Sequence, residues 1–314
     1  MPSHDLSSPP APGQSTCRSC WLAAPGLLWM GLFFLVPLAL VFAISFASRG
    51  TYGGIVWEFT AANYLDLWHP LYGKILGQSL WYASLTTAIC FVLGFPLAYM
   101  IARSPARWQP VLLLLVMLPF WTNFLVRTYA WMIVLRQDGL VNGLLRALGI
   151  VDAPLELLYT PTAVVIGLVY GYLPFMVLPL YVAVERLDPR LVEAAWDLYA
   201  SRWAIFTRVV VPLTMPGIVG GCVLVFIPSI GSFITPDLLG GARSMMIGNL
   251  IQHEYLVVRD WPLGSAVSAK AQAVLVSTPV TSAPTTPVTT MVTSVPGAIS
   301  PSWRSRPTGT TAGK

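Results

Sequence analysis

The residues able to do chemistry are few in this 314-residue chain. Only 10% of its residues are charged, and the four cysteines include a single C-x-x-C pair, Cys17 and Cys20. A zinc site would need a second pair of ligands beside this one, and no histidine lies nearby. No H-E-x-x-H, G-x-S-x-G or phosphate-binding glycine loop occurs. The sequence therefore indicates no metal site, no cofactor site and no hydrolytic site.

Two polar residues inside a long apolar stretch are candidates for a functional role. Asn123 and Arg127 are four positions apart and would share one face of a helix. An ionisable residue within a membrane span is a candidate functional group. An arginine lining a pathway would repel a cationic solute, so a structural or partner-contact role is favoured for Arg127.

Aromatic residues in the same stretches could offer the faces of their rings to an organic cation. Candidates for lining a solute pathway are therefore Trp121, Tyr170 and Tyr172, with Trp131, beside Asn123 and Arg127. Aromatic side chains are also common at membrane interfaces and in helix cores, and that alternative stays open for each of them.

The composition indicates what kind of scaffold positions these residues. The chain is 55% hydrophobic, whereas a soluble domain has about 25% charged residues, so this one lacks the material for a normal wetted surface. The net charge of +5 is spread out, with no basic run longer than two residues, which disfavours nucleic-acid binding. The prediction is an all-α membrane protein.

Five apolar runs are each long enough for the roughly 20 residues that cross a bilayer as a helix. The predicted spans are about 22–47, 78–102, 111–135, 161–184 and 209–230. Prolines interrupt most of them and predict kinks, which neighbouring helices can accommodate. The 103–107 loop has two arginines and no acid, so it is expected on the cytoplasmic side.

The two ends differ in composition from the predicted membrane domain, residues 21–268. Residues 1–20 are polar and rich in proline, and they are predicted to be a disordered leader. Residues 269–314 have no acid and no long apolar run, and Thr, Ser, Pro, Ala and Val dominate them. Such a low-complexity tail is predicted to be disordered and cannot span a membrane.

The most informative stretch is the loop 187–208, which leads into the fifth span. Asp188 is a good N-cap, Pro189 suits a first helical position, and Ser201 can cap a second short helix. Apolar residues recur at helical spacing and make one face: Leu187, Leu191, Ala194, Ala195 and Leu198. The pattern predicts a helix-turn-helix on the membrane surface. Its apolar face could dock into a partner or lie in the interface alone.

Glu193-Ala194-Ala195, followed by Phe206 and Pro212, resembles the EAA loop of permease subunits of ATP-binding-cassette importers. In that family the loop inserts into a cleft of a cytoplasmic ATPase. The resemblance therefore implies a role in ATPase coupling for a set of loop residues, namely Glu193, Ala194, Ala195, Asp197, Tyr199, Arg202, Phe206 and Pro212.

Residues 22–268 are similar, more specifically, to the spermidine/putrescine type of permease. The matching motifs are Pro119-Phe-Trp-Thr-Asn123, Arg127-Thr-Tyr-Ala-Trp131, Leu158-Tyr-Thr-Pro161, Tyr170-Gly-Tyr-Leu-Pro-Phe175, Phe226-Ile-Pro-Ser229, Thr235-Pro-Asp-Leu-Leu-Gly240, Met246-Ile-Gly-Asn-Leu-Ile251 and Arg259-Asp-Trp-Pro262. Related branches that import other small solutes share parts of them.

The resemblance implies a type I importer fold in a bacterial inner membrane, with five clear transmembrane helices and a sixth missing or replaced. It also implies a second homologous permease, a cytoplasmic ATPase and an extracytoplasmic solute-binding protein as partners, besides membrane lipid. The chain itself would catalyse no reaction, and its substrate would be a polyamine. An intramembrane enzyme, the rival class, would need a paired nucleophile and base that is not evident.

Two departures from the family pattern bear on activity. The family has glycine six residues after the glutamate of the loop, where this chain has Tyr199. The family also has a sixth span where this chain has its Thr/Pro-rich tail, for which a frameshifted reading frame is the preferred explanation and a divergent tail the alternative. The alternative function is accordingly a non-transporting or inactivated permease-like protein.

Overall fold

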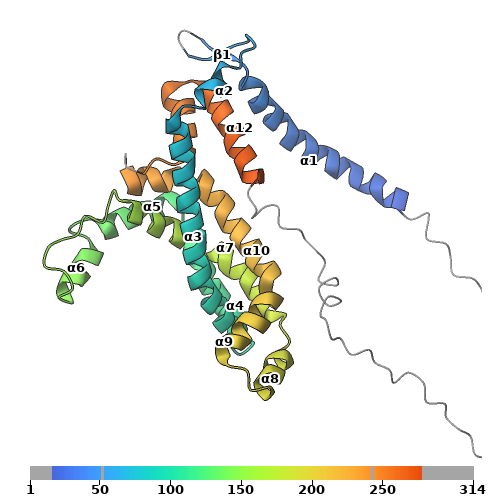
Figure 1. Ribbon diagram of the computed structural model, residues 1–314, viewed down its shortest axis with the longest axis vertical. Coiled ribbons are helices and arrows are strands. Elements are labelled where there is room, and N and C mark those ends of the chain that lie inside the picture. Colours follow the sequence, from blue (N-terminus) through green and yellow to red (C-terminus); the bar gives the residue numbers. More distant parts are fainter. Residues whose placement is uncertain (1–15, 51–52, 242–243, 278–314) are drawn as a thin grey trace, which may run out of the picture.

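The computed structural model describes residues 16–50, 53–241 and 244–277, and nearly all of its elements are helices (Figure 1). The label η marks a π-helical turn. In chain order the elements are α1 (Thr16–Ile44), β1 (Ser48–Arg49), β2 (Ile55–Val56), α2 (Ala62–Asp66), α3 (Pro70–Ala102), α4 (Gln109–Trp121), α5 (Phe124–Leu135), α6 (Leu140–Ala147), α7 (Pro161–Glu185), α8 (Pro189–Asp197), α9 (Arg202–Ile205), η1 (Phe206–Val210), α10 (Val211–Gly231), η2 (Pro236–Gly240), α11 (Ile247–His253), η4 (Glu254–Val258) and α12 (Trp261–Ser277).

The core of the molecule is the packed trio α3, α7 and α10. Met176, Val177 and Leu180 of α7 are fully buried in it, against residues such as Ala98 of α3 and Val225 of α10. Small residues allow the helix backbones to approach closely, which is how membrane helices gain packing energy. A Cβ added at Gly221, for example, would lie 2.8 Å from the sulfur of Met176.

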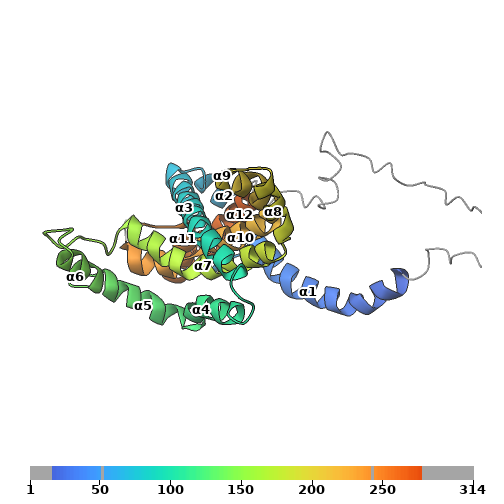
Figure 2. The same cartoon turned by 90° about the horizontal axis from the view of Figure 1, so that it is seen from below.

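Length and apolarity identify three helical segments able to cross a membrane among the described residues: α3, α7 and the continuous stretch Arg202–Gly231. The count rises to four if α4 and the stretch that starts with α5 form one bent span. The first predicted run forms α1, whose described apolar part, Leu28–Ile44, is shorter. α1 leaves the bundle on the side opposite to α6 (Figure 2).

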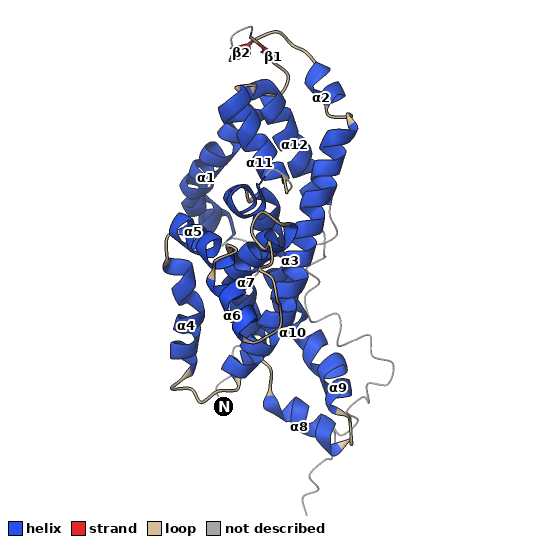
Figure 3. Cartoon of the chain, turned by 90° about the vertical axis from the view of Figure 1, so that its left-hand side faces the viewer, coloured by secondary structure: helices blue, strands red, loops and turns tan. Residues whose placement is uncertain are grey.

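The third predicted span, 111–135, is not one straight helix. The chain bends by 87° between α4 and the segment that begins with α5, a much sharper change of direction than the kink that the prolines predict. Thr122 is extended, and the side chain of Asn123 accepts a hydrogen bond from the N–H of Leu125 at 2.9 Å, which starts a new helix. Figure 3 shows α4 below α5 on the same side of the bundle.

Both predicted boundaries of the membrane domain lie inside helices. α1 begins at Thr16, within the predicted leader, and α12 continues past residue 268 to Ser277. Ala266, Val267 and Ala271 of α12 are buried in a cluster with Ile75 of α3, so packing extends the helix into the segment whose composition suggested disorder. The remainder of the predicted leader and tail, residues 1–15 and 278–314, lies outside the described residues.

A small cap closes the end of the bundle opposite to α8 and α9 (Figure 1). The strands β1 and β2 pair antiparallel, with Ser48 opposite Val56. Arg49 of β1 pairs with Asp260 at 3.7 Å and donates to the carbonyl of Val258 at 3.0 Å. The hairpin is thereby joined to the turn between η4 and α12.

Candidate functional site: the loop between α7 and α10

α8 follows α7 after a three-residue connection, and its start is the one that the sequence predicts. The side chain of Asp188 accepts a hydrogen bond from the N–H of Arg190 at 3.0 Å, and Pro189 occupies the first turn. A carboxylate at this position satisfies a backbone donor that has no partner within the helix. Both predicted start signals are confirmed.

The turn that ends α8 is left-handed, and Tyr199 occupies the left-handed position with φ at 55°. The N–H of Ala200 donates to the carbonyl of Ala195 at 3.2 Å, and the N–H of Tyr199 donates to that of Trp196 at 2.9 Å. This pair of bonds is the Schellman motif, whose left-handed residue is usually glycine. The geometry gives a physical reason for the glycine of the family pattern at this position.

The second helix of the loop starts at a predicted cap and continues into α10. The side chain of Ser201 accepts from the N–H of Ala204 at 3.2 Å. The π-turn η1 then closes with a bond from the N–H of Val211 to the carbonyl of Phe206, five residues back. Pro212 follows and has no N–H to donate to the carbonyl of Arg208, so the regular ladder is interrupted at this point.

The inner side of the loop is packed onto the core. Leu187 and Ile205 are buried, and Val192 and Ala195 contact the same cluster while half-buried. The ring of Phe206 meets that of Phe95 in α3 edge-to-face, with centroids 5.2 Å apart. The loop is therefore in direct contact with α3.

The outer side of the loop combines acids with apolar residues. The sequence predicts one apolar face, but its residues are divided between the side packed on the core and the exposed side. Leu187 and Ala195 face the core, whereas Leu191, Ala194 and Leu198 are exposed, with Leu198 81% exposed. Periodicity alone cannot distinguish an apolar stripe directed inward from one directed outward. The other exposed residues of the predicted coupling set are Glu193, Asp197, Tyr199, Arg202 and, at the start of α10, Pro212.

Part of the predicted pathway set lies together where α5 passes α7. The guanidinium of Arg127 donates to the carbonyl of Pro119 at 3.3 Å and lies over the rings of Phe124 and Tyr170, at 5.1 Å and 5.8 Å. Trp131 meets Tyr170 edge-to-face at 5.4 Å. Arg127, Trp131 and Tyr170 line a cavity of about 350 Å³.

The other members of that set lie apart from Arg127 or have local structural partners. The side chain of Asn123 is the cap of α5. Trp121 is exposed at the end of α4. The hydroxyl of Tyr172 donates to the carbonyl of Pro228 at 3.1 Å, which joins α7 to α10. Around this cavity the structure therefore brings together Arg127, Tyr170 and Trp131.

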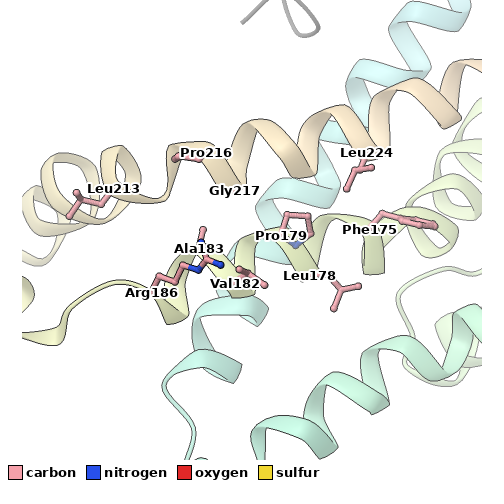
Figure 4. Close-up of a pocket in the computed structure, with 10 residues that line it drawn as sticks. All are labelled: Phe175, Leu178, Pro179, Val182, Ala183, Arg186, Leu213, Pro216, Gly217 and Leu224. Atoms are coloured by element: carbon pink, nitrogen blue, oxygen red, sulfur yellow. The ribbon is translucent and has the colours of Figure 1, made fainter. Parts of the chain in front are cut away.

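A larger groove, of about 500 Å³, runs between α7 and α10 (Figure 4). Its walls are apolar, and the side chain of Arg186 lies toward one end of it, with Phe175 and Leu224 toward the other. No acid lines it. No local pattern in the sequence marks this groove, since it depends on the close contact of Gly217 with Pro179 and Ala183 across the two helices.

Within the described ranges, no group of three or more His, Cys, Asp or Glu side chains could hold a metal ion. Cys90 is a free thiol buried in the core, and Cys222 is a half-buried free thiol packed against it. The side chains of Cys17 and Cys20, for which the sequence indicates no metal site, lie outside the part of the chain whose side chains are described.

Comparison with known proteins identifies the family. Residues 92–280 match the family model described as the binding-protein-dependent transport system inner membrane component. This chain belongs to that family. The matched segment contains the whole loop 187–208, runs past residue 268 and includes all of α12.

Several relatives are similar over most of their length. The spermidine/putrescine transport system permease protein PotB of Haemophilus influenzae is 47% identical over 240 residues, covering 76% of this chain and 84% of that protein. PotB of Escherichia coli K12 is 46% identical over 240 residues, covering 76% and 87%. The inner membrane ABC transporter permease protein YdcU of E. coli K12 is 30% identical over 284 residues, covering 83% and 90%.

Solved structures support the fold. A chain of a bacterial alginate ABC transporter, crystallised with an alginate-pentasaccharide-bound periplasmic protein, has a TM-score of 0.66 and 18% identity, covering 82% of this chain and 91% of that chain. A second structure of a bacterial ABC transporter involved in alginate import has a TM-score of 0.63. The predicted all-α importer permease fold is thereby confirmed. The protein is an inner-membrane, multi-pass transport subunit and not an enzyme.

Proposed function

We propose that this chain is the permease subunit of an ATP-driven importer of polyamines. It would form the translocation pathway with a second, homologous permease, receive solute from an extracytoplasmic binding protein and be driven by a cytoplasmic ATPase. The identity of 46–47% to spermidine/putrescine permeases, over 76% of the chain, supports this substrate class. The relatives lend no support to an inactivated protein.

The single observation that carries the mechanism is the exposed outer side of α8 and its turn. Leu198 and Tyr199 are 81% and 98% exposed, and Ala194 beside them is small enough to allow close approach of a partner. An apolar helix face exposed in this way is suited to a groove on another protein. We assign that groove to the ATPase. Glu193 and Asp197 flank the apolar residues and would contact basic groups at its rim.

The contacts of the loop indicate how ATPase motion reaches the pathway. α8 starts three residues after α7 ends, so the connection leaves little slack between them. Phe206 is in contact with Phe95, and Pro212 marks the wider turn at the start of α10. ATP-driven movement of α8 would therefore reorient α3, α7 and α10 together, while Arg202 remains at the membrane surface.

We assign Arg127 a structural role in the pathway region, not a role in binding the cation. Its guanidinium already covers one face of Tyr170, so that face is not free for an amine. A fixed positive charge there would also repel a polyamine. The exposed residues Trp121 and Tyr170 and the half-buried Tyr172 remain candidates for lining the pathway.

Two variants of the full chain test the coupling. Leu198→Glu places a charge on the proposed ATPase contact, and Leu140→Glu is its matched control on α6, where Leu140 is 73% exposed. We expect Leu198→Glu to abolish co-purification with the ATPase and uptake of labelled spermidine, while Leu140→Glu retains both. Equal co-purification of both variants would refute the loop as the ATPase contact.

The substrate is tested separately, by uptake into cells that lack their own polyamine importers. ATPase binding by the unaltered chain without uptake of spermidine or putrescine would refute the substrate class and leave the coupling role intact.

A further inference from the structure

A second groove, of about 750 Å³, lies between α3 and the loop that carries α8 and α9. Figure 1 shows α9 beside the lower end of α3. Phe91, Val92 and Phe95 of α3 line one side of the groove. Trp196 and Trp203 of the loop line the other side and are exposed. Neither the family assignment nor the coupling role gives this space an occupant.

The groove changes in polarity along its length. Phe91 and Val92 lie within α3, a helix long and apolar enough to cross a membrane. Toward the end of α3 the lining includes Tyr99 and Arg202, and the guanidinium of Arg103 lies over the ring of Tyr99 at 5.5 Å. An occupant that matches this order is apolar at one end and anionic at the other.

Among the described residues, neither arginine has an acidic partner. The one ion pair among the described residues is that of Arg49 with Asp260, at the opposite end of the bundle. Arg202 and Arg103 therefore have no described carboxylate within 4.0 Å, and no acid lines the groove. Exposed tryptophans beside them are typical of the level at which lipid headgroups lie.

We propose that this groove binds one anionic phospholipid of the cytoplasmic leaflet. An acyl chain lies against Phe91, Val92 and Phe95, and the phosphate lies between Arg202 and Arg103. A cytoplasmic protein would have to insert an apolar segment among residues of a membrane span to reach the same walls, whereas lipid would border the exposed side of α3, on which Val92 lies. The lipid would contact α3 and the loop at once, next to the Phe95–Phe206 contact that joins them.

Binding of this lipid does not depend on the proposed transport function. The consequence of binding does rest on the proposed function, because a bound lipid would hold the loop against α3 and thus change how ATPase motion is transmitted. The test therefore measures lipid retention by the full-length chain itself, without ATPase or substrate.

The measurement is native mass spectrometry of the chain in detergent, titrated with phosphatidylglycerol or with phosphatidylcholine of the same acyl composition. Each arginine near a lipid surface strengthens binding of an anionic lipid by about fivefold. We expect the unaltered chain to retain phosphatidylglycerol in preference to phosphatidylcholine. The double variant Arg103→Gln with Arg202→Gln should lose about 25-fold in affinity for phosphatidylglycerol.

The matched control is Arg190→Gln with Arg208→Gln, which removes the same charge from exposed positions of the same loop that do not line the groove. It should bind as the unaltered chain does. Val92→Trp fills the apolar part from an exposed position and leaves the charges in place, so it should lower phosphatidylglycerol retention as well.

Three results would overturn the proposal. Equal retention of the two lipids by the unaltered chain, which requires no variant to fold, would exclude selection for an anion. Equal losses in the two double variants would show attraction by net charge alone. Unchanged binding by Val92→Trp would place the lipid outside the groove.

Discussion

Replacing Tyr199 by glycine should stabilise the turn between α8 and α9. The residue has φ at 55°, in the region where a Cβ is close to the following carbonyl oxygen. That conformation costs a non-glycine residue about 1–2 kcal/mol, and glycine adopts it without this cost. The Tyr199 side chain is 98% exposed, so its removal sacrifices almost no packing.

The net gain is smaller than the relieved strain. Glycine makes the unfolded chain more flexible, which offsets roughly 0.5–1 kcal/mol of the benefit. A net stabilisation of about 1 kcal/mol remains, which corresponds to about fivefold slower opening of the turn, since RT is about 0.6 kcal/mol. The hydrogen bonds that report this opening are those donated by residues 199 and 200 to Trp196 and Ala195.

The assay is amide hydrogen exchange, followed by mass spectrometry on peptides that cover residues 194–204 of the full chain. Tyr199→Ala is the control, because it removes the ring and keeps a Cβ in the left-handed region. We expect slower exchange in Tyr199→Gly and unchanged exchange in Tyr199→Ala. Equal slowing in both variants would show that the ring causes the strain, and no slowing in either would refute the argument from backbone conformation.

Three further predictions concern the caps, the core and the outer end. Ser201→Ala should destabilise the start of α9 by about 1 kcal/mol and speed local hydrogen exchange, because it removes an N-cap. Gly221→Val should separate α7 from α10, because its side chain would collide with Met176, and a loss of monodisperse protein in size-exclusion chromatography would report this. Glu254→Gln should slow exchange around η4 at neutral pH, because burial and then the charge of Asp260 raise the pKa of Glu254.

The pH dependence of the last effect has a definite sign. A raised pKa means that the folded state disfavours the ionised carboxylate, so Glu254 costs stability at pH values above its folded pKa. The advantage of glutamine should therefore disappear as the pH falls below the unfolded pKa of about 4.3. An advantage that persists at lower pH would exclude ionisation as the cause.

The other two variants have matched controls. Thr207→Ala, at an exposed position within η1, is the control for Ser201→Ala. Gly231→Val, at a glycine with open space around it, is the control for Gly221→Val.

Features set by local chemistry could be predicted from the sequence. Asp188, Pro189 and Ser201 each act on backbone groups within three residues, so their roles follow from residue type and position. The left-handed turn at Tyr199 follows in the same way, since the family glycine at that position indicates a conformation that glycine adopts most easily.

Features that depend on tertiary contacts could not be predicted. Hydropathy averaged over 111–135 hides the break at Thr122 and Asn123, although Asn123 is itself a helix-start signal that follows Pro119 closely. The composition after residue 268 suggested disorder, whereas Ala266 and Ala271 pack against the outer half of α3 and the helix persists. Both grooves arise between elements far apart in sequence, so no local pattern marks them.

The places where the backbone departs from regular helix bear on how the permease would move. The interior around Met176 is close-packed, and Gly221 leaves no space for a larger residue against it, so α7 and α10 are expected to move as one body. The backbone is irregular at two places that border this close-packed interior: the break between α4 and α5, and the π-turn η1. Because hinges need residues that absorb changes in backbone angle, we expect alternating access to bend the chain at these two places and to leave the α7–α10 contact unchanged.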